Sequence, residues 1–149
     1  MSPLATAIVF LLAIPATAFA IEPGDSCPKS GKLPPRMICS HESVVINCAE
    51  TQQRRIESLL CVDDEYKNAD KRLNALYQGI LKNMKTSEDS PLKKQLIEGQ
   101  RAWVRFKEAD CEIEGEFAKP GMWGDVFVVG CQLEHTKQRI KVLEGRFGK

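Results

Sequence analysis

Six cysteines constrain the fold of this 149-residue chain more than any other feature, and all of them follow residue 20. They are Cys27, Cys39, Cys48, Cys61, Cys111 and Cys131. An even count in an exported chain is typical of a disulfide-bonded protein. Zinc is the competing interpretation, but no two cysteines form a CxxC pair and the only histidines are His41 and His135. We therefore expect three disulfides and no metal or other cofactor.

The first twenty residues have the features of an export signal. They contain no charged side chain, carry an apolar run and end in the small-x-small pattern Ala18-Phe19-Ala20. The apolar run is too short to cross a bilayer comfortably. We interpret residues 1–20 as a signal peptide, with a retained anchor as the alternative. Cleavage would leave a periplasmic or secreted chain without a membrane span.

The charge pattern bears on the kind of partner. Net charge is +1, and acidic and basic residues are interleaved. This pattern lacks the basic footprint of a nucleic-acid-binding protein, and the absence of a basic tract gives no reason to expect a membrane-surface helix. We expect a protein partner and no nucleic acid.

Residues 21–47 differ in composition from the rest of the chain. Proline and glycine recur throughout this segment. Proline interrupts both helices and the hydrogen-bond ladders of β-sheets. We expect an irregular N-terminal loop, with a brief extended piece at residues 44–46.

Residues 48–149 have helical periodicity. A short helix, capped by Thr51, is expected to end near Cys61, and apolar residues spaced by three and four predict a second helix up to Met84. Ser90-Pro91 is typical of a helix start, and Gly115 of a helix end. The prediction is an all-α, disulfide-bonded array of three long helices plus one short helix.

Two of these helices carry polar or aromatic residues of interest. The third helix contains Trp103 and Phe106, which we expect to share one buried face. The last helix has apolar residues from Val129 to Phe147, interrupted by Thr136. The Thr136 hydroxyl is expected to bond a carbonyl four residues back.

Six cysteines allow many pairings, and we favour those that close local loops between predicted helix ends. These are Cys27–Cys39, Cys48–Cys61 and Cys111–Cys131. The second is the most demanding pair, because a continuous helix would separate its cysteines by about 15 Å or more. The chain before Thr51 must therefore double back along the first helix.

An ordered set of positions resembles, in order and spacing, the lysozyme inhibitor LprI-like N-terminal domain family over about residues 48–145. They include Cys48, Thr51, Cys61, Asp70, Leu73, Asn74, Tyr77, Gln100, Trp103, Phe106, Cys111, Cys131, Thr136, Arg139 and Leu143. The resemblance implies a small helical, disulfide-bonded, periplasmic or extracellular protein, and lysozyme inhibition for the namesake. Family members commonly have Arg-Asp where this chain has Lys107-Glu108, and the Cys27–Cys39 segment lies outside the pattern.

Several of these polar residues lie near apolar stripes, and two interpretations stay open. One is an interhelical hydrogen-bond network that fixes helix register, and the other is a binding groove with Trp103 or Tyr77 as a wall. The residues are Asp70, Asn74, Gln100, Lys107, Thr136 and Arg139.

The sequence does not indicate an enzyme. Every cysteine can pair, no Ser/His/Asp set is visible, and paired carboxylates lie at predicted helix ends where capping and solvation explain them.

The expected function is that of a binding protein, with lysozyme as one candidate partner. An inhibitor has to fill the groove that holds the two catalytic carboxylates of lysozyme. The best candidate is the Cys27–Cys39 loop with Lys29, Lys32 and Arg36, since a disulfide and prolines pre-organise it. A second loop, residues 117–124, offers Lys119 and Trp123. The alternatives are an envelope interaction or scaffold domain that inhibits nothing, and a small-ligand carrier.

Overall fold

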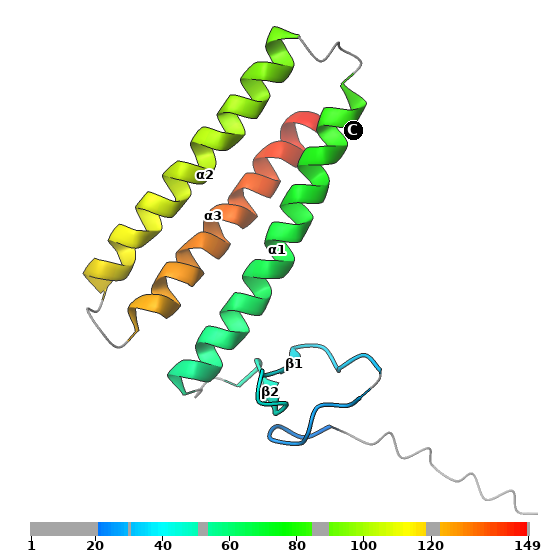
Figure 1. The fold of residues 1–149 in the computed structure, drawn as a ribbon, viewed down its shortest axis with the longest axis vertical. Helices are drawn as coiled ribbons and strands as arrows, with labels where there is room; N and C mark the ends of the chain where they lie inside the picture. Colours follow the sequence, from blue (N-terminus) through cyan, green and yellow to red (C-terminus); the bar gives the residue numbers. More distant parts are fainter. Residues whose placement is uncertain (1–20, 30, 51–53, 85–89, 119–122, 149) are drawn as a thin grey trace, which may run out of the picture.

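The computed structural model describes residues 21–29, 31–50, 54–84, 90–118 and 123–148, so the expected signal peptide lies outside the described residues. Two short strands precede three long helices (Figure 1). In chain order the elements are β1 (Met37–Cys39), β2 (Val45–Asn47), α1 (Arg55–Asn83), α2 (Pro91–Ala118) and α3 (Gly124–Phe147). The expected all-α, disulfide-bonded class is confirmed.

The middle position in the bundle belongs to α3. It packs against both α1 and α2, whereas α1 and α2 contact each other far less (Figure 1). The chain runs in the same direction along α1 and α3 and in the opposite direction along α2. Two ion pairs follow this parallel order, Arg55 with Asp125 near the starts of α1 and α3, and Arg72 with Glu144 further along.

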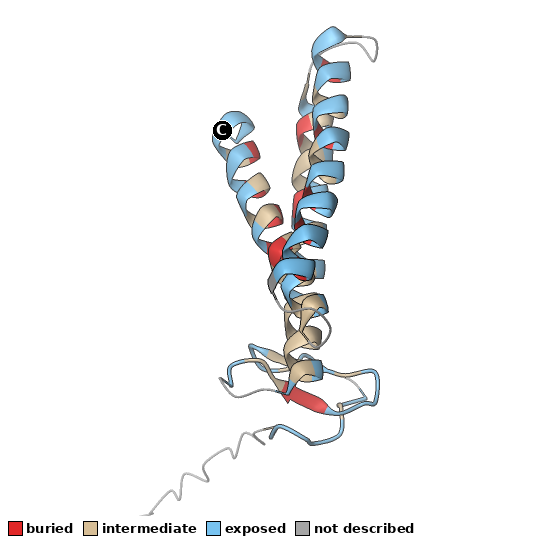
Figure 2. Ribbon diagram, turned by 90° about the vertical axis from the view of Figure 1, so that its left-hand side faces the viewer, coloured by how far each residue is buried: buried red, intermediate tan, exposed pale blue. Residues whose placement is uncertain are grey.

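The apolar core lies where α1 and α3 face each other. Its centre is Leu73, Ile80, Ile140 and Leu143, which are at most 7% exposed. Burying each such side chain contributes roughly 1.5–3 kcal/mol. Four partly buried residues pack around this centre: Leu76, Met84, Leu96 and Trp103. The buried side of each helix faces its neighbours in Figure 2.

The separate short helix predicted before residue 61 is wrong, because it is the beginning of a continuous α1. The acidic run Asp63-Asp64-Glu65 is typical of a helix start, but it begins no new helix, and Asp63 and Asp64 pair with residues one turn forward in α1. Lys67 forms an ion pair with Asp63, and Asn68 donates a hydrogen bond to Asp64 (3.0 Å). The expected cap Thr51 lies outside the described residues, and the Glu57 carboxylate instead accepts the Arg54 backbone N–H at 3.1 Å.

The predicted start of α2 at Pro91 is confirmed, but its predicted end is wrong. Gly115 does not stop the helix, which continues to Ala118. Gly115 is buried, and a Cβ built on it would lie 2.3 Å from Cγ2 of Val128. Its lack of a side chain permits close approach of α2 and α3. Only residues 119–123 separate the two helices, fewer than the glycine-rich loop that the sequence suggests.

The N-terminal segment is more ordered than the irregular loop expected from its composition. β1 and β2 form an antiparallel hairpin in which Ile38 lies opposite Ile46, and Ser26 bridges to Val44. Val45 and Ile46 are buried. Hydrogen bonds between the two strands satisfy backbone groups of this segment, and the periodicity of the sequence does not predict this pairing.

The three disulfides are the favoured pairs, with Cα–Cα distances of 5.8, 5.6 and 5.5 Å. Cys27–Cys39 closes the N-terminal segment, Cys48–Cys61 joins it to α1, and Cys111–Cys131 joins α2 to α3. Cys48 reaches Cys61 because it precedes α1, so the chain doubles back as the length argument required.

Two glycines of α2 provide a matched test of this packing. Gly115→Ala should lower the free energy of unfolding by about 1–3 kcal/mol, because its methyl group overlaps Val128. Gly99→Ala places the same methyl group in open space and should stabilise the protein by roughly 0.5–1 kcal/mol. Urea unfolding measures both, and equal effects would contradict the close contact.

Candidate functional site

The N-terminal module, residues 21–50, projects from the bundle beside the start of α1 (Figure 1). Cys27–Cys39 ties it internally, and Cys48–Cys61 ties it to α1. Backbone hydrogen bonds brace its open end, with Gly24 N donating to Val45 O at 2.8 Å and Val45 N donating to Asp25 O at 2.8 Å. The module is therefore a pre-organised projection, whose conformational entropy is largely lost on folding rather than on binding.

The three basic residues predicted for the loop differ in their freedom. Lys29 and Lys32 are exposed, and neither has an ion-pair partner among the described residues. Arg36 is also exposed, but its guanidinium donates a hydrogen bond to the Cys48 carbonyl oxygen at 3.0 Å. Arg36 holds φ at 64°, a left-handed conformation that is uncommon for residues other than glycine. The structure thus gives Arg36 a local bracing role and leaves both lysines available.

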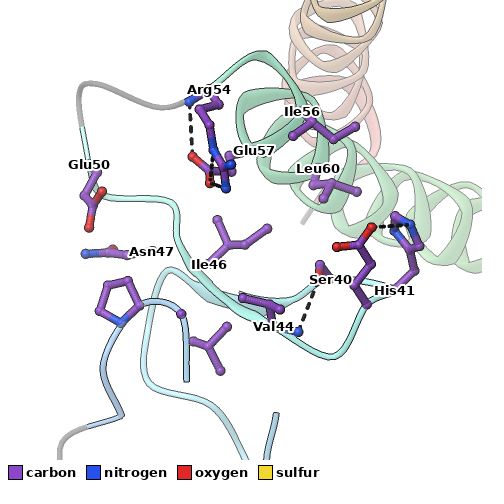
Figure 3. A pocket seen from close by; sticks show the side chains of 14 residues that line it. Ser40, His41, Val44, Ile46, Asn47, Glu50, Arg54, Ile56, Glu57 and Leu60 are labelled. Atoms are coloured by element: carbon purple, nitrogen blue, oxygen red, sulfur yellow. Dashed lines mark hydrogen bonds and ion pairs between the residues drawn. The ribbon is translucent and has the colours of Figure 1, made fainter. Parts of the chain in front are cut away.

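A pocket of about 510 Å³ lies where the module meets the first turns of α1 (Figure 3). Its apolar lining includes Val44, Ile46, Ile56 and Leu60. Charged and polar groups also line it: His41, Glu42, Asn47, Glu50, Arg54 and Glu57. None of the three basic loop residues lines this pocket. No local sequence pattern predicts the pocket, because it combines segments that are separated along the chain.

Within this pocket, Arg54 and Glu57 are engaged with each other. Arg54 Nε donates to Glu57 Oε1 at 2.9 Å, and hydrogen bonds from the Arg54 side chain and then its backbone N–H lower the pKa of Glu57. The Glu42 carboxylate lies 3.9 Å from His41 Nε2 (Figure 3), and Glu50 is an exposed residue on the same rim. The pocket offers an apolar floor and a mixed charged rim, which suits a protein side chain better than a fully charged ligand.

The second predicted loop is described only in part. Lys119 lies outside the described residues. Trp123 is half-buried beside the first turn of α3, where its carbonyl oxygen accepts the Phe127 N–H at 3.1 Å. Trp123 is not one of the residues packed around the apolar core.

Several of the polar family residues meet around Trp103, in what we name the Trp103 cluster (Tyr66, Gln100, Trp103, Lys107 and Arg139). Lys107 is 4% exposed, and its ammonium donates to the Tyr66 hydroxyl at 2.8 Å and lies 5.3 Å from the Trp103 ring centre. Arg139 lies 5.6 Å from the same ring and donates to Gln100 Oε1 at 3.0 Å. The cluster joins all three helices, which supports the predicted network for these residues.

Other predicted members of the network do not join it. Asp70 accepts a hydrogen bond from Asn74 (2.9 Å) one turn along α1, so this pair lies within a single helix. Thr136 is fully buried, but its hydroxyl has no hydrogen-bond partner among the described residues, so the predicted bond to the preceding turn is wrong. Phe106 is 55% exposed, because three residues rotate it about 60° from Trp103, off the buried face.

Phe106 instead covers a histidine. Its ring meets His135 edge-on at 5.6 Å, and His135 Nε2 lies 2.8 Å from Asp110 Oδ2. His135 also lies near the sulfurs of Cys111 and Cys131, a set with the spacing of metal ligands. Those two sulfurs are bonded to each other, so neither is a thiolate and this set cannot hold a metal.

The environment of Tyr77 completes the predicted residues. Burial raises the pKa of Tyr77 above its usual value, and the nearby positive charges of Arg101 and Arg139 oppose this shift only partly. Burial also lowers the pKa of Arg139, and repulsion from Arg146 acts in the same direction.

None of the helices in the described part of the chain has the length and apolarity needed to cross a membrane.

These features define a small disulfide-bonded helical bundle with a disulfide-held projecting module. The chain belongs to the family described as "Lysozyme inhibitor LprI", which it matches over residues 47–143. It is also similar to "Uncharacterized protein R02472" of Rhizobium meliloti (strain 1021), at 28% identity over 94 residues, covering 57% of this chain and 68% of the relative. No solved structure gives a significant match. The three disulfides and the inhibitor family together indicate an extracytoplasmic, non-enzymatic protein.

The Trp103 cluster can be tested as a structural rather than a binding feature. Arg139→Ala should lower the free energy of unfolding by about 1–3 kcal/mol, since it removes a ring contact and leaves Gln100 without its donor. Lys141→Ala, which removes an exposed cation from the same helix, should cost less than about 0.5 kcal/mol. Any inhibition, measured on folded protein, should be unchanged. Loss of binding at full stability would instead indicate a groove.

The buried tyrosine gives a pH test. A raised pKa in the folded state means that the Tyr77 contribution is fully present below the unfolded-state pKa of about 10 and is lost as pH rises through the folded-state value. Compared with Tyr77→Phe, the wild type should therefore lose stability as the pH rises above about 10. Urea unfolding at several pH values measures this difference, and a difference independent of pH would contradict it.

Proposed function

We propose that this protein is a periplasmic or secreted inhibitor of lysozyme that acts by occluding the glycan-cleaving cleft. The observation that carries the proposal is membership of the lysozyme inhibitor family, over residues 47–143. The helical bundle acts as the scaffold, and the N-terminal module supplies the inserting element.

The charge and rigidity of the loop support this assignment. Lysozyme cleaves its substrate with two carboxyl groups in an open groove. The ammonium groups of Lys29 and Lys32 have no ion-pair partner among the described residues, so they can pair with such carboxylates without first breaking a bond within the chain. The disulfide and the bracing hydrogen bond of Arg36 hold the loop in place, which reduces the entropy lost on binding.

The pocket between the module and α1 supplies a second contact. Its floor around Ile46 and Ile56 can receive an apolar side chain from the rim of the enzyme cleft, next to the inserted loop. Lys119 and Trp123 come before α3 in the sequence, with Trp123 directly before its first residue. We assign both residues a secondary role in the same contact.

The decisive experiment compares two double variants of equal charge. Lys29→Ala/Lys32→Ala should weaken inhibition of a susceptible lysozyme by on the order of 10–100-fold, because two cations are lost from the inserting loop. Lys71→Ala/Lys82→Ala removes two exposed cations from α1 and should leave inhibition unchanged. Initial rates of peptidoglycan hydrolysis, with lysozymes of several structural types and oxidised protein, measure both.

Arg36 is kept in these variants because its replacement would also remove the hydrogen bond to Cys48. Full inhibition by Lys29→Ala/Lys32→Ala would reject the loop as the inserting element. Absence of inhibition by the folded wild type would reject inhibition itself and favour the envelope interaction domain, whose partner a pull-down from envelope extract would then identify.

A further inference from the structure

The surface of α2 carries an exposed apolar stripe, and only its Phe106 ring has a described ring contact with α3, at His135. The stripe follows helical spacing and consists of five exposed residues, Ala102, Phe106, Ala109, Ile113 and Phe117. Phe106 is 55% exposed, Ile113 57% and Phe117 85%. Among the described elements, α2 packs against α3 and hardly contacts α1, so one side of α2 has no neighbouring helix (Figure 1). Three large exposed apolar side chains on one helix face indicate an interaction surface.

A row of charges beside this stripe changes sign along the helix. The row consists of Arg101, Arg105, Glu108, Glu112 and Glu116, all exposed. Arg101 hydrogen-bonds to Glu98 within α2 (2.7 Å), whereas Arg105 and Glu112 have no ion-pair partner in the described ranges. The surface is therefore basic toward the start of α2 and acidic toward its end.

We propose that this surface binds a second copy of the same chain, with the two α2 helices antiparallel. Reversing one copy brings its acidic end opposite the basic end of the other, so that Arg105 of each copy lies opposite Glu112 of the other. A parallel arrangement would place like charges together. A two-fold axis makes the contact self-complementary, and flanking charges are the feature that sets partner and orientation in paired helices.

The apolar residues fit the same register. When Arg105 faces Glu112, Phe106 of one copy meets Ala109 of the other, and Ile113 meets Ala102. Phe106 and Ile113 thus each face a small residue, which lets the helices approach closely along about 17 Å of helix. A groove of about 850 Å³ is lined by Ala109, Ile113 and Phe117 of the stripe and by residues at the start of α3, and it gives the incoming side chains room.

The pairing goes beyond lysozyme inhibition and does not depend on it. The N-terminal module lies at the end of the bundle where α2 finishes (Figure 1). Antiparallel pairing places the two modules at opposite ends of the dimer, so each copy presents its loop to a separate target molecule.

Charge reversal tests the proposal directly. Sedimentation velocity of the oxidised chain should show a concentration-dependent dimer. Arg105→Glu and Glu112→Arg should each weaken dimerisation on the order of tenfold or more, since each places two like-charge pairs across the axis. An equimolar mixture of these two variants should form a heterodimer, and the double variant Arg105→Glu/Glu112→Arg should recover the homodimer. Circular dichroism checks that each variant is folded.

Ile113→Asp supplies an apolar test at an exposed position, where failure to fold is not expected, and should also yield monomer. A wild type that stays monomeric up to hundreds of micromolar overturns the proposal. So does a dimer that these substitutions leave unchanged, or one in which mixing the two charge variants restores nothing.

Discussion

Packing of α3 against both other helices is the contact on which the bundle depends. Leu73 and Ile80 of α1 meet Ile140 and Leu143 of α3, whereas α1 and α2 make little contact of their own. α2 is held to α3 by the close approach at Gly115, the Cys111–Cys131 bridge and the Trp103 cluster. An apolar seam therefore joins α1 to α3, whereas a polar, cross-linked seam joins α2 to α3 and leaves large apolar side chains of α2 exposed.

The polar seam has an energetic logic. A buried lysine loses its hydration, and among the described residues no carboxylate compensates Lys107. Its ammonium is instead satisfied by a hydroxyl and by the faces of two aromatic rings, and Arg139 contacts the same indole. Such an arrangement adds little net stability, but it tolerates few alternative positions of α2, because a slip along the helix would separate both cations from their partners.

The sequence predicted what local patterns control. Helical spacing predicted the all-α class, the Ser90-Pro91 pair predicted the start of α2, and the preference for short loops between helix ends predicted the disulfide pairs. It failed where long-range packing overrides a local signal. Gly115 has the chemistry of a helix end, yet the proximity of Val128 gives it another role, and the acidic run at Asp63 is neutralised one turn onward rather than starting a helix. The exposure of Phe106 and the lack of a described hydrogen-bond partner for the Thr136 hydroxyl depend on where the neighbouring helices lie. The spacing of residues along one helix does not show this. The pocket at the module depends on how two remote segments meet.

The Cys48–Cys61 bridge has a consequence for the behaviour of the module in different environments. This bond fixes the direction in which the loop leaves α1, while Cys27–Cys39 fixes its internal shape. A thiol reductant that opened only the bridge to α1 would leave the Cys27–Cys39 bond in place, but the loop could then move relative to α1. The loop would keep its charges but would no longer be held in one direction relative to α1. The redox state of the surroundings would therefore set whether the loop and α1 act as one rigid body.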